Sequence, residues 1–341
     1  WDDPGFFPIG VWWSGVSSAS EVNFDKSLGL NFYTEINPDT DYNLIQDNGM
    51  YWVGQPGLRN LKDDSPNWVG SFLGDEVDGR FDPPSAGFTE LQRAEDAAPP
   101  AITGRFRYAN FTSSVLSYDR KPTDAEKYVN DYTDAVSIDA YFHSVPQCSW
   151  DQNWARYIVD VPKSTCRTAH TYGQMIDALR IRDQADGHLQ MLWNFIEPYA
   201  PETADGYHAV SPEQVKGATM ASIIHEARGI IYFNQVFSGP CATGNFFRAA
   251  QNDPHGCAGP NTQAVKEVNT QIKTLAPVIN TQSYRWTFGP QLDTMLKIKD
   301  GYAYIFAMTD GTQGKRTLQL PTGLTTTAEV LNENRRITTT N

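Results

Sequence analysis

Acidic residues cluster directly after an apolar run in the stretch SFLGDEVDG, residues 71–79. Asp75 and Glu76 are adjacent, and Asp78 follows two residues later. A further acid, Glu197, lies in the apolar setting LWNFIEPY, where a casual surface charge is unexpected. Hydrolysis of a glycosidic bond needs two facing carboxyl groups, one to donate a proton and one to attack or to activate water. Glu76 and Glu197 are candidates for such a pair if the fold brings them together, whereas Asp78 is expected in a solvated turn.

The elements that must position these acids are eight short apolar runs separated by helix-like segments. The runs are 6–13, 31–36, 50–55, 68–74, 106–111, 135–142, 188–195 and 229–237. Helices are expected at 20–28, 41–48, 89–97, 124–133, 171–186 and 211–228, the last beginning with a capping box at Ser211. Nearly continuous apolar strands that alternate with helices predict a parallel sheet. Eight such units predict an α/β fold, a closed (β/α)8 TIM barrel over residues 1–275.

The sequence pattern changes after residue 275. Runs of alternating character such as QLDTMLKIK and YAYIFAM are separated by Asp-Gly pairs at 300–301 and 310–311. Strands joined by tight turns of this composition are typical of antiparallel sheets. We therefore expect residues 276–341 to form a small C-terminal antiparallel β domain that packs on the barrel.

In a barrel of this kind, functional residues gather at the carboxyl ends of the strands. Glu76 follows the fourth apolar run and Glu197 follows the seventh, so both carboxyl groups are expected to face one cleft. This arrangement resembles the clan-A (β/α)8 glycoside hydrolases. The Gly-Asp-Glu of residues 74–76 is similar to the Gly-Asp-Glu-Pro found at strand four in some of them, with Val77 in place of the proline. The Ala-Arg-Gly of residues 227–229 is similar to the turn that enters their last strand. The resemblance implies that Glu76 is the general acid/base and Glu197 the nucleophile.

Other residues near these strand ends are assigned supporting roles by the same resemblance. Tyr141 and His143, at the end of the sixth run, occupy the place of a side chain that hydrogen-bonds the nucleophile. Asp75 is expected to orient sugar hydroxyls or to tune Glu76. A different mechanism stays open, in which the acids after strands four and six, Asp75 and Asp139, form the catalytic pair.

Aromatic and polar side chains at the same face are candidates for binding a sugar, because aromatic rings stack on the apolar faces of sugar rings. Trp13, Trp52 and Trp193 have the best positions for stacking, although core packing is the favoured interpretation for any single tryptophan. The polar candidates for binding hydroxyl groups are Glu35, Asn110 and Asn234. A non-catalytic carbohydrate-binding barrel is the alternative from another functional class.

The charge and the motifs exclude other classes of function. The formal net charge of −13 argues against a nucleic-acid partner, because affinity for phosphates comes from lysine and arginine. No apolar run reaches the roughly 18 residues that span a bilayer, so no membrane partner is expected. Phosphate-binding glycine loops and the His-Glu-x-x-His motif are both missing from the sequence. We therefore expect no cofactor and no metal, and a carbohydrate as the substrate.

Four cysteines fall into two local pairs, Cys148 with Cys166 and Cys241 with Cys257. Neither pair has the spacing of a zinc site, and an even number of cysteines in such pairs predicts two disulfides. Disulfides form in oxidising compartments, so an extracellular location is expected. A first residue other than methionine, Trp1, fits either a mature secreted domain or a shortened chain.

Overall fold

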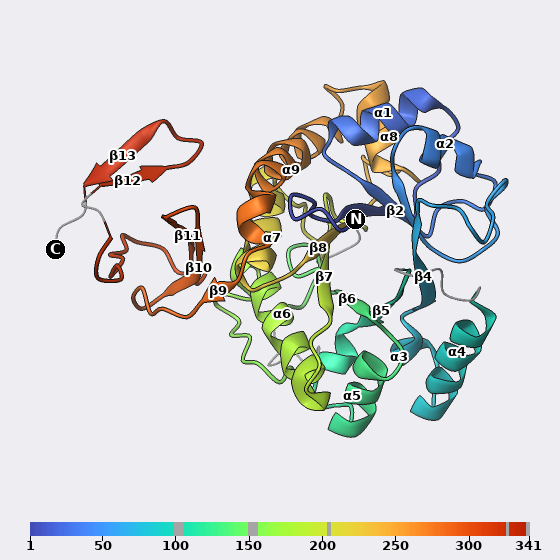
Figure 1. The fold of residues 1–341 in the computed structure, drawn as a ribbon, viewed down its shortest axis with the longest axis horizontal. Coiled ribbons are helices and arrows are strands. Elements are labelled where there is room, and N and C mark those ends of the chain that lie inside the picture. Colours follow the sequence, from blue (N-terminus) through green and yellow to red (C-terminus); the bar gives the residue numbers. More distant parts are fainter. Residues whose placement is uncertain (99–104, 149–155, 203–205, 325–326, 339–341) are drawn as a thin grey trace.

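The computed structural model describes residues 1–98, 105–148, 156–202, 206–324 and 327–338. Its centre is a closed barrel of parallel strands in which each strand pairs with the next and β8 pairs with β1 (Figure 1). The strands are β1 (Ile9–Trp12), β2 (Phe32–Thr34), β3 (Tyr51–Val53), β4 (Trp68–Asp75), β5 (Phe106–Thr112), β6 (Ala135–Asp139), β7 (Met191–Ile196) and β8 (Gly229–Phe233). The (β/α)8 barrel predicted from the sequence is confirmed.

Helices surround the barrel and connect its strands (Figure 1). They are α1 (Ala19–Ser27), α2 (Tyr42–Asp47), α3 (Val77–Arg80), α4 (Pro84–Ala97), α5 (Pro122–Asn130), α6 (Ala169–Asp183), α7 (Pro212–Ile224), α8 (Phe246–Asn252) and α9 (Gly259–Ile279), with 3-10 turns at Ser113–Leu116 and Gln184–Asp186. The capping box predicted at Ser211 is present, since its side chain accepts from the Gln214 N–H and the Gln214 side chain accepts in return. Three helices, α3, α8 and α9, were not expected from the sequence.

Buried side chains contributed by all eight strands fill the inside of the barrel. They are Trp12, Phe32, Val53, Phe72, Phe106, Tyr108, Ala135, Trp193, Phe195 and Ile231. The ring of Trp193 lies 4.9 Å from that of Tyr108 and 5.2 Å from that of Phe32, measured between centroids. Trp1 packs its ring against the same group, 5.4 Å from Phe106, and Figure 1 places the N-terminus over the middle of the barrel. Aromatic burial of this extent is a main source of the barrel's stability.

The C-terminal part of the chain forms two small antiparallel sheets. The chain passes the expected boundary inside α9 and then forms β9 (Ser283–Tyr284), β10 (Leu292–Lys299) and β11 (Tyr302–Thr309), in the order β11-β10-β9. A separate hairpin pairs β12 (Thr327–Val330) with β13 (Arg335–Thr338). The three-stranded sheet packs on the barrel through α7 and α9 (Figure 1, left). The predicted small antiparallel C-terminal domain is therefore confirmed.

Two disulfides join Cys148 to Cys166 and Cys241 to Cys257, the pairs that the sequence predicts. Their Cα atoms lie 5.4 and 5.8 Å apart. The first closes the segment between β6 and α6, and the second closes the segment between β8 and α9. Among the helices in the described part of the chain, none combines the length and apolar character needed to cross a bilayer.

Candidate active site

A cavity of about 550 Å³ opens at the carboxyl ends of the barrel strands. Residues at or just beyond the ends of β1, β2, β4, β6, β7 and β8 line it. Its acidic lining residues are Glu35, Asp75, Glu76, Asp139 and Glu202, and Arg80 is the basic one. Its aromatic lining residues are Trp12, Trp13, Tyr141, Phe195, Tyr207, Phe233 and Phe237. Carboxyl groups and aromatic rings thus share one concave surface, as is usual for a binding site.

Three of the residues that line the cavity have a left-handed backbone, which is uncommon outside glycine. Their φ angles are 50° at Trp13, 49° at Glu35 and 51° at Glu76. Each follows the last residue of its strand, and neighbouring strands hold two of them in place. The Glu76 N–H donates to the Asn110 carbonyl at 2.8 Å, and the Trp13 N–H donates to the Thr34 carbonyl at 3.2 Å. Such strained positions tend to gather at functional sites.

Close packing explains why a glycine precedes the two acids in the Gly-Asp-Glu sequence at the end of β4. A Cβ atom at Gly74 would lie 2.7 Å from the Cγ1 atom of Val77, so a larger residue would displace the start of α3. The pairing of β4 with β5 also shifts register between Phe72 and Gly74. This irregularity precedes Asp75 and Glu76, both of which line the cavity. The local sequence therefore serves to place two adjacent acids at one strand end.

Arg80 joins these two acids. Its guanidinium group donates to an oxygen of Asp75 and to Oε2 of Glu76, with Nη2 at 3.0 Å and Nε at 3.3 Å from the latter. Arg80 lies four residues after Glu76, on α3, and was not among the residues expected at the site. Acid and base at this spacing on a helical turn are a recognisable signal. The pair of acids therefore shares one positive partner at the cavity wall.

Asp78 is buried, so its prediction as part of a solvated turn is wrong. Its carboxylate accepts from the Thr112 N–H at 2.9 Å, from the Thr112 hydroxyl at 2.7 Å and from the Ser114 hydroxyl at 2.6 Å. Buried carboxylates need such partners. Asp78 thus fixes the turn after β4 to the end of β5.

A buried chain of hydrogen bonds supports Asp75 from inside the barrel. The Asn110 amide donates to Oδ1 of Asp75 at 3.0 Å, and the Ser137 hydroxyl donates to the Asn110 oxygen at 2.7 Å. The Tyr108 hydroxyl lies 2.6 Å from that of Ser137. Burial raises the pKa of Asp75, and the Asn110 bond opposes the rise. Asn110 is itself buried and does not line the cavity, so in this structure it holds an acid rather than meeting a ligand.

Asp139, the last residue of β6, faces the same cavity as Glu76. Burial raises the pKa of Asp139 well above its usual range, and the negative charge and hydrogen-bonding contact of Glu76 raise it further. Its Oδ1 atom has no hydrogen-bond partner among the described residues. The structure thus brings the acids of strands four and six into contact at the cavity.

Glu197 lies directly beyond β7 and is fully buried, outside the lining of the cavity. Its Oε1 atom accepts from the Tyr172 hydroxyl at 2.5 Å and from the His143 N–H at 3.2 Å. The other oxygen, Oε2, has no partner among the described residues. Burial raises the pKa of Glu197 to about 7, and the Tyr172 hydrogen bond opposes the rise. Tyr172, at the start of α6, carried no signal in the sequence.

Tyr141 and Ser144 form the wall of the cavity in the segment that follows β6. The pKa of Tyr141 is raised well above its usual range, first by burial and then by the negative charges of Asp139 and Glu197. Its hydroxyl has no hydrogen-bond partner in the described part of the chain. Tyr141 therefore lies close to the acids of both β6 and β7.

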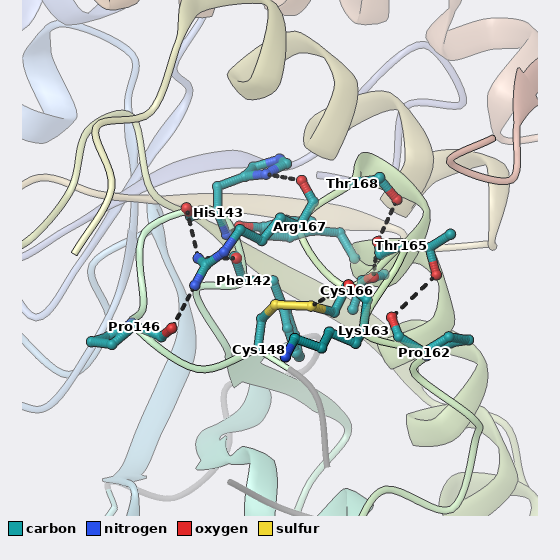
Figure 2. Close-up of a disulfide and its surroundings, with 12 residues drawn as sticks. Phe142, His143, Pro146, Cys148, Pro162, Lys163, Thr165, Cys166, Arg167 and Thr168 are labelled. Atoms are coloured by element: carbon teal, nitrogen blue, oxygen red, sulfur yellow. Dashed lines mark hydrogen bonds between the residues drawn. A yellow bond between two sulfur atoms is a disulfide. The ribbon is translucent and has the colours of Figure 1, made fainter. Parts of the chain in front are cut away.

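The segment after β6 is held by Arg167 and by the first disulfide, as Figure 2 shows. The Arg167 guanidinium donates to the carbonyls of Phe142 and His143, both at 3.3 Å, and to that of Pro146 at 2.7 Å. The His143 ring places Nδ1 3.0 Å from the Arg167 carbonyl. Burial lowers the pKa of His143 to about 4, so its ring is neutral near pH 7. His143 thus contacts Glu197 through its main-chain N–H, and its imidazole supports the loop.

The three tryptophans singled out in the sequence occupy different environments. Trp13 is 45% exposed and lines the cavity, beside the exposed Phe237. Trp193 and Trp52 are 0% and 2% exposed, and neither lines the cavity. Trp193 is enclosed by the aromatic interior of the barrel, and Trp52 belongs to the core outside it. Their side chains pack against protein, and in this structure they are not available to a ligand.

The structure also places two of the polar candidates in different environments. Glu35 lines the cavity, and burial, together with the charge of Asp75, raises its pKa to about 7. Asn234 is fully buried, donates to Oδ1 of Asn245 at 2.9 Å and accepts from the Phe247 N–H at 3.0 Å. Asn234 therefore anchors the start of α8.

The architecture is that of a TIM barrel with an acidic cavity at its strand ends. Solved structures of glycoside hydrolases share the fold. A glycoside hydrolase family 5 structure from Bacteroides vulgatus has a TM-score of 0.54 and 12% identity, covering 88% of this chain and 76% of the other. A β-galactosidase from the haloarchaeon Halorubrum lacusprofundi has a TM-score of 0.51 and 13% identity, covering 79% and 58%.

This chain spans about half the length of a β-glucuronidase from Ruminococcus gnavus, of which it covers 49%, at a TM-score of 0.46 and 10% identity. No protein-family model matches the chain. No curated protein matches it either. At their identities the family 5 and β-galactosidase structures support the fold alone, and the barrel that the sequence resemblance implies is confirmed.

Proposed function

We propose that this chain hydrolyses glycosidic bonds of a polysaccharide or oligosaccharide at the cavity described above. The observation that carries the proposal is the gathering of five acidic residues and several aromatic rings at the carboxyl ends of a (β/α)8 barrel. Aromatic rings bind sugar faces, and carboxyl groups supply the proton transfer that cleavage requires. The two disulfides support export to an oxidising compartment.

Glu76 delivers the proton to the leaving oxygen, with Asp139 as its partner. Asp139 is buried beside Glu76, and burial and a neighbouring negative charge both favour the protonated form of its carboxyl group. The raised pKa of Asp139 supports this arrangement, because it keeps a proton at the cavity. Arg80 holds Glu76 at the wall. The pair thus acts as the general acid.

Glu197 is the second carboxyl group of the proposed mechanism. Its support is its position directly beyond β7 and its buried carboxyl group, of which one oxygen has no partner among the described residues. Tyr141 and Ser144 line the cavity, and Tyr141 lies close to Glu197. Because Glu197 does not itself line the cavity, the segment after β6 must move for Glu197 to reach the anomeric carbon.

The burial of Glu197 is also the observation that favours the other mechanism. Asp75 and Asp139 both line the cavity, whereas Glu197 does not. In that mechanism these two aspartates cleave the bond, and Glu197 only supports the loop after β6. A non-catalytic barrel that binds carbohydrate is the remaining alternative. In such a protein the aromatic and acidic residues of the cavity would bind the sugar, and no proton transfer would occur.

The test compares three single variants, Glu76→Gln, Glu197→Gln and Asp139→Asn, on a panel of glycans and aryl glycosides. Release of reducing ends by the wild type, with at least ~1000-fold loss of kcat in Glu76→Gln and Glu197→Gln, is the expected result. Glu90→Gln on the surface of α4 is the matched control and should keep full activity. Nearly full activity in Glu197→Gln together with inactive Asp139→Asn would instead indicate that Asp75 and Asp139 form the catalytic pair.

Azide identifies the nucleophile directly. In Glu197→Ala, azide is expected to restore turnover of an aryl glycoside and to form a glycosyl azide of inverted configuration, because it replaces the attacking carboxylate. In Glu76→Ala, azide should attack the glycosyl-enzyme and give the retained configuration. Binding of glycans without hydrolysis by the wild type would instead establish the non-catalytic barrel.

A further inference from the structure

Two histidines and an aspartate meet where the C-terminal sheet packs on the barrel, away from the cavity. His170 is on α6, His225 follows α7, and Asp293 is on β10. Their ligand atoms all lie within 4.8 Å of one another. In the part of the chain that the structure describes, no other group of three histidine, cysteine or acidic residues meets this criterion. We call these three residues the histidine cluster.

The contacts within the histidine cluster converge on one carboxylate. His170 places Nδ1 2.6 Å from Oδ2 of Asp293, and His225 places Nε2 3.5 Å from Oδ1. The three side chains are 17%, 13% and 8% exposed, in the same order. In the described chain, the ion pairs of Asp293 are with these two histidines. Two imidazoles and a carboxylate therefore meet at a largely buried point.

The ring of His225 is oriented for a ligand at Nε2. Its Nδ1 atom lies 2.8 Å from Oδ2 of Asp177, which fixes the ring from the other side. The buried Nε2 atom has no hydrogen-bond partner among the described residues. Gly173 leaves the room for this ring, since a Cβ atom there would lie 2.2 Å from Cδ2 of His225. A carboxylate that holds the far nitrogen of an imidazole is the usual support for a metal-binding histidine.

We propose that His170, His225 and Asp293 bind one Zn²⁺ ion that fastens the C-terminal sheet to the barrel. Zinc takes imidazole nitrogens at about 2.0–2.1 Å and carboxylate oxygens at about 2.0–2.2 Å, in tetrahedral geometry. Ligand atoms of such a site are roughly 3.3 Å apart, so the closest pair, at 2.6 Å, must open by less than ~1 Å, and the widest pair, within 4.8 Å, must close by up to ~1.5 Å. A water molecule completes the fourth position. None of the three residues lines the cavity, so the ion has no part in hydrolysis.

The ion links elements that are distant in the chain. β10 packs against α7 and α9, and the histidine cluster adds α6 to that contact. A metal that binds only the docked arrangement stabilises it by mass action. The C-terminal sheet, which is small and antiparallel, gains a fixed attachment in this way.

The experiment uses the whole chain, stripped with a chelator and dialysed. Titration with ZnCl₂ in a calorimeter should show one tight site, and the melting temperature should rise on addition of the metal. His170→Ala, His225→Ala and Asp293→Asn should weaken Zn²⁺ binding at least ~100-fold, and Asp177→Asn, which removes only the support, about 10- to 100-fold. His188→Ala is the control, because His188 is an exposed histidine that also lies beside an aspartate.

Replacement of Zn²⁺ by Co²⁺ gives a second readout that needs no unfolding. A tetrahedral cobalt site in the wild type produces an intense visible absorption, which Asp177→Asn should shift and Asp293→Asn should abolish while circular dichroism shows a folded protein. Equal Zn²⁺ affinity in the wild type, His188→Ala and the cluster variants would overturn the proposal, as would failure of the wild type to bind Zn²⁺ at all. No step measures hydrolysis, so the result is independent of the proposed enzymatic activity.

Discussion

The carboxyl group of Glu197 is buried, and hydrogen bonds satisfy it only in part. The Tyr172 hydroxyl and the His143 N–H satisfy Oε1, while Oε2 has no partner among the described residues. An unpaired buried charge is costly, so the group holds a proton up to a higher pH than usual. At the residue scale, the stability of the protein therefore depends on the protonation state of this side chain, and so does the catalytic role that we propose for it.

The pH dependence of stability is the first expected consequence. The pKa of Glu197 is about 7 in the folded protein, against an ordinary value of 4.5. Its contribution to stability is therefore full below pH 4.5 and is lost as pH rises through 7. We expect the stability of the wild type, relative to Glu197→Gln, to fall by up to about 3 kcal/mol between pH 4 and pH 8. Urea unfolding at both pH values measures this difference, and a constant difference would contradict the assignment.

Removal of the Tyr172 hydroxyl should act on the same carboxyl group. In Tyr172→Phe, the hydrogen bond that lowers the pKa of Glu197 is missing, so that pKa should rise. If ionised Glu197 is required for turnover, the acidic limb of the kcat/KM profile moves to higher pH. Tyr128→Phe is the control, because it removes a tyrosine hydroxyl that joins α5 to α4. The acidic limb of its kcat/KM profile should lie at the same pH as in the wild type.

At the scale of elements, the segment after β6 contributes both to the cavity wall and to the surroundings of Glu197. It carries Tyr141, which lines the cavity, and the His143 N–H, which contacts the buried carboxyl group. Arg167 and the disulfide between Cys148 and Cys166 hold this segment from the side of α6 (Figure 2). Movement of this segment, which the proposed mechanism requires, is therefore restrained by Arg167 and the disulfide.

Loss of the Arg167 guanidinium should loosen this segment. Arg167→Ala removes the donor to three carbonyl groups, and we expect a loss of about 2–4 kcal/mol in the free energy of unfolding. Faster hydrogen exchange should appear at residues 141–146, because their carbonyls lose a common partner. Urea unfolding and exchange mass spectrometry check both effects. Arg93→Ala, on the exposed face of α4, should change stability by less than about 0.5 kcal/mol.

At the scale of the whole molecule, aromatic residues divide between two tasks. Those inside the barrel, such as Trp193, hold the strands together from within, and those at its mouth, such as Trp13, are available to a ligand. The division follows from position along the barrel axis. It also separates the stability of the fold from the binding of a substrate.

Substitution of these two tryptophans should give opposite results. Trp193→Ala removes a fully buried ring and is expected to cost about 3–5 kcal/mol of stability. Trp13→Ala, at a 45% exposed position, should cost less than about 1 kcal/mol but weaken the binding of a glycan several-fold. Unfolding in urea and glycan affinity measure the two effects. A stable Trp193→Ala protein with reduced glycan affinity would contradict this division and indicate that Trp193 binds the glycan.

Local pattern was enough to determine the barrel and the place of its acids. Apolar runs in alternation with helices specify parallel strands, and the position of Asp75 and Glu76 after the fourth run specifies the cavity edge on which they lie. The two disulfides followed from the positions of their cysteines. These features depend on residues that are near one another in the chain, which is why they can be read without coordinates.

Only the tertiary structure decided which side chains are accessible and which remote groups meet. Burial of Glu197, enclosure of Trp193 and contact between Asp139 and Glu76 all depend on packing between different strands and helices. The histidine cluster likewise joins α6, α7 and β10, whose residues are far apart in the sequence. Periodicity along the chain fixes the type of each element. The environment of a side chain is set by neighbours that the sequence does not place beside it.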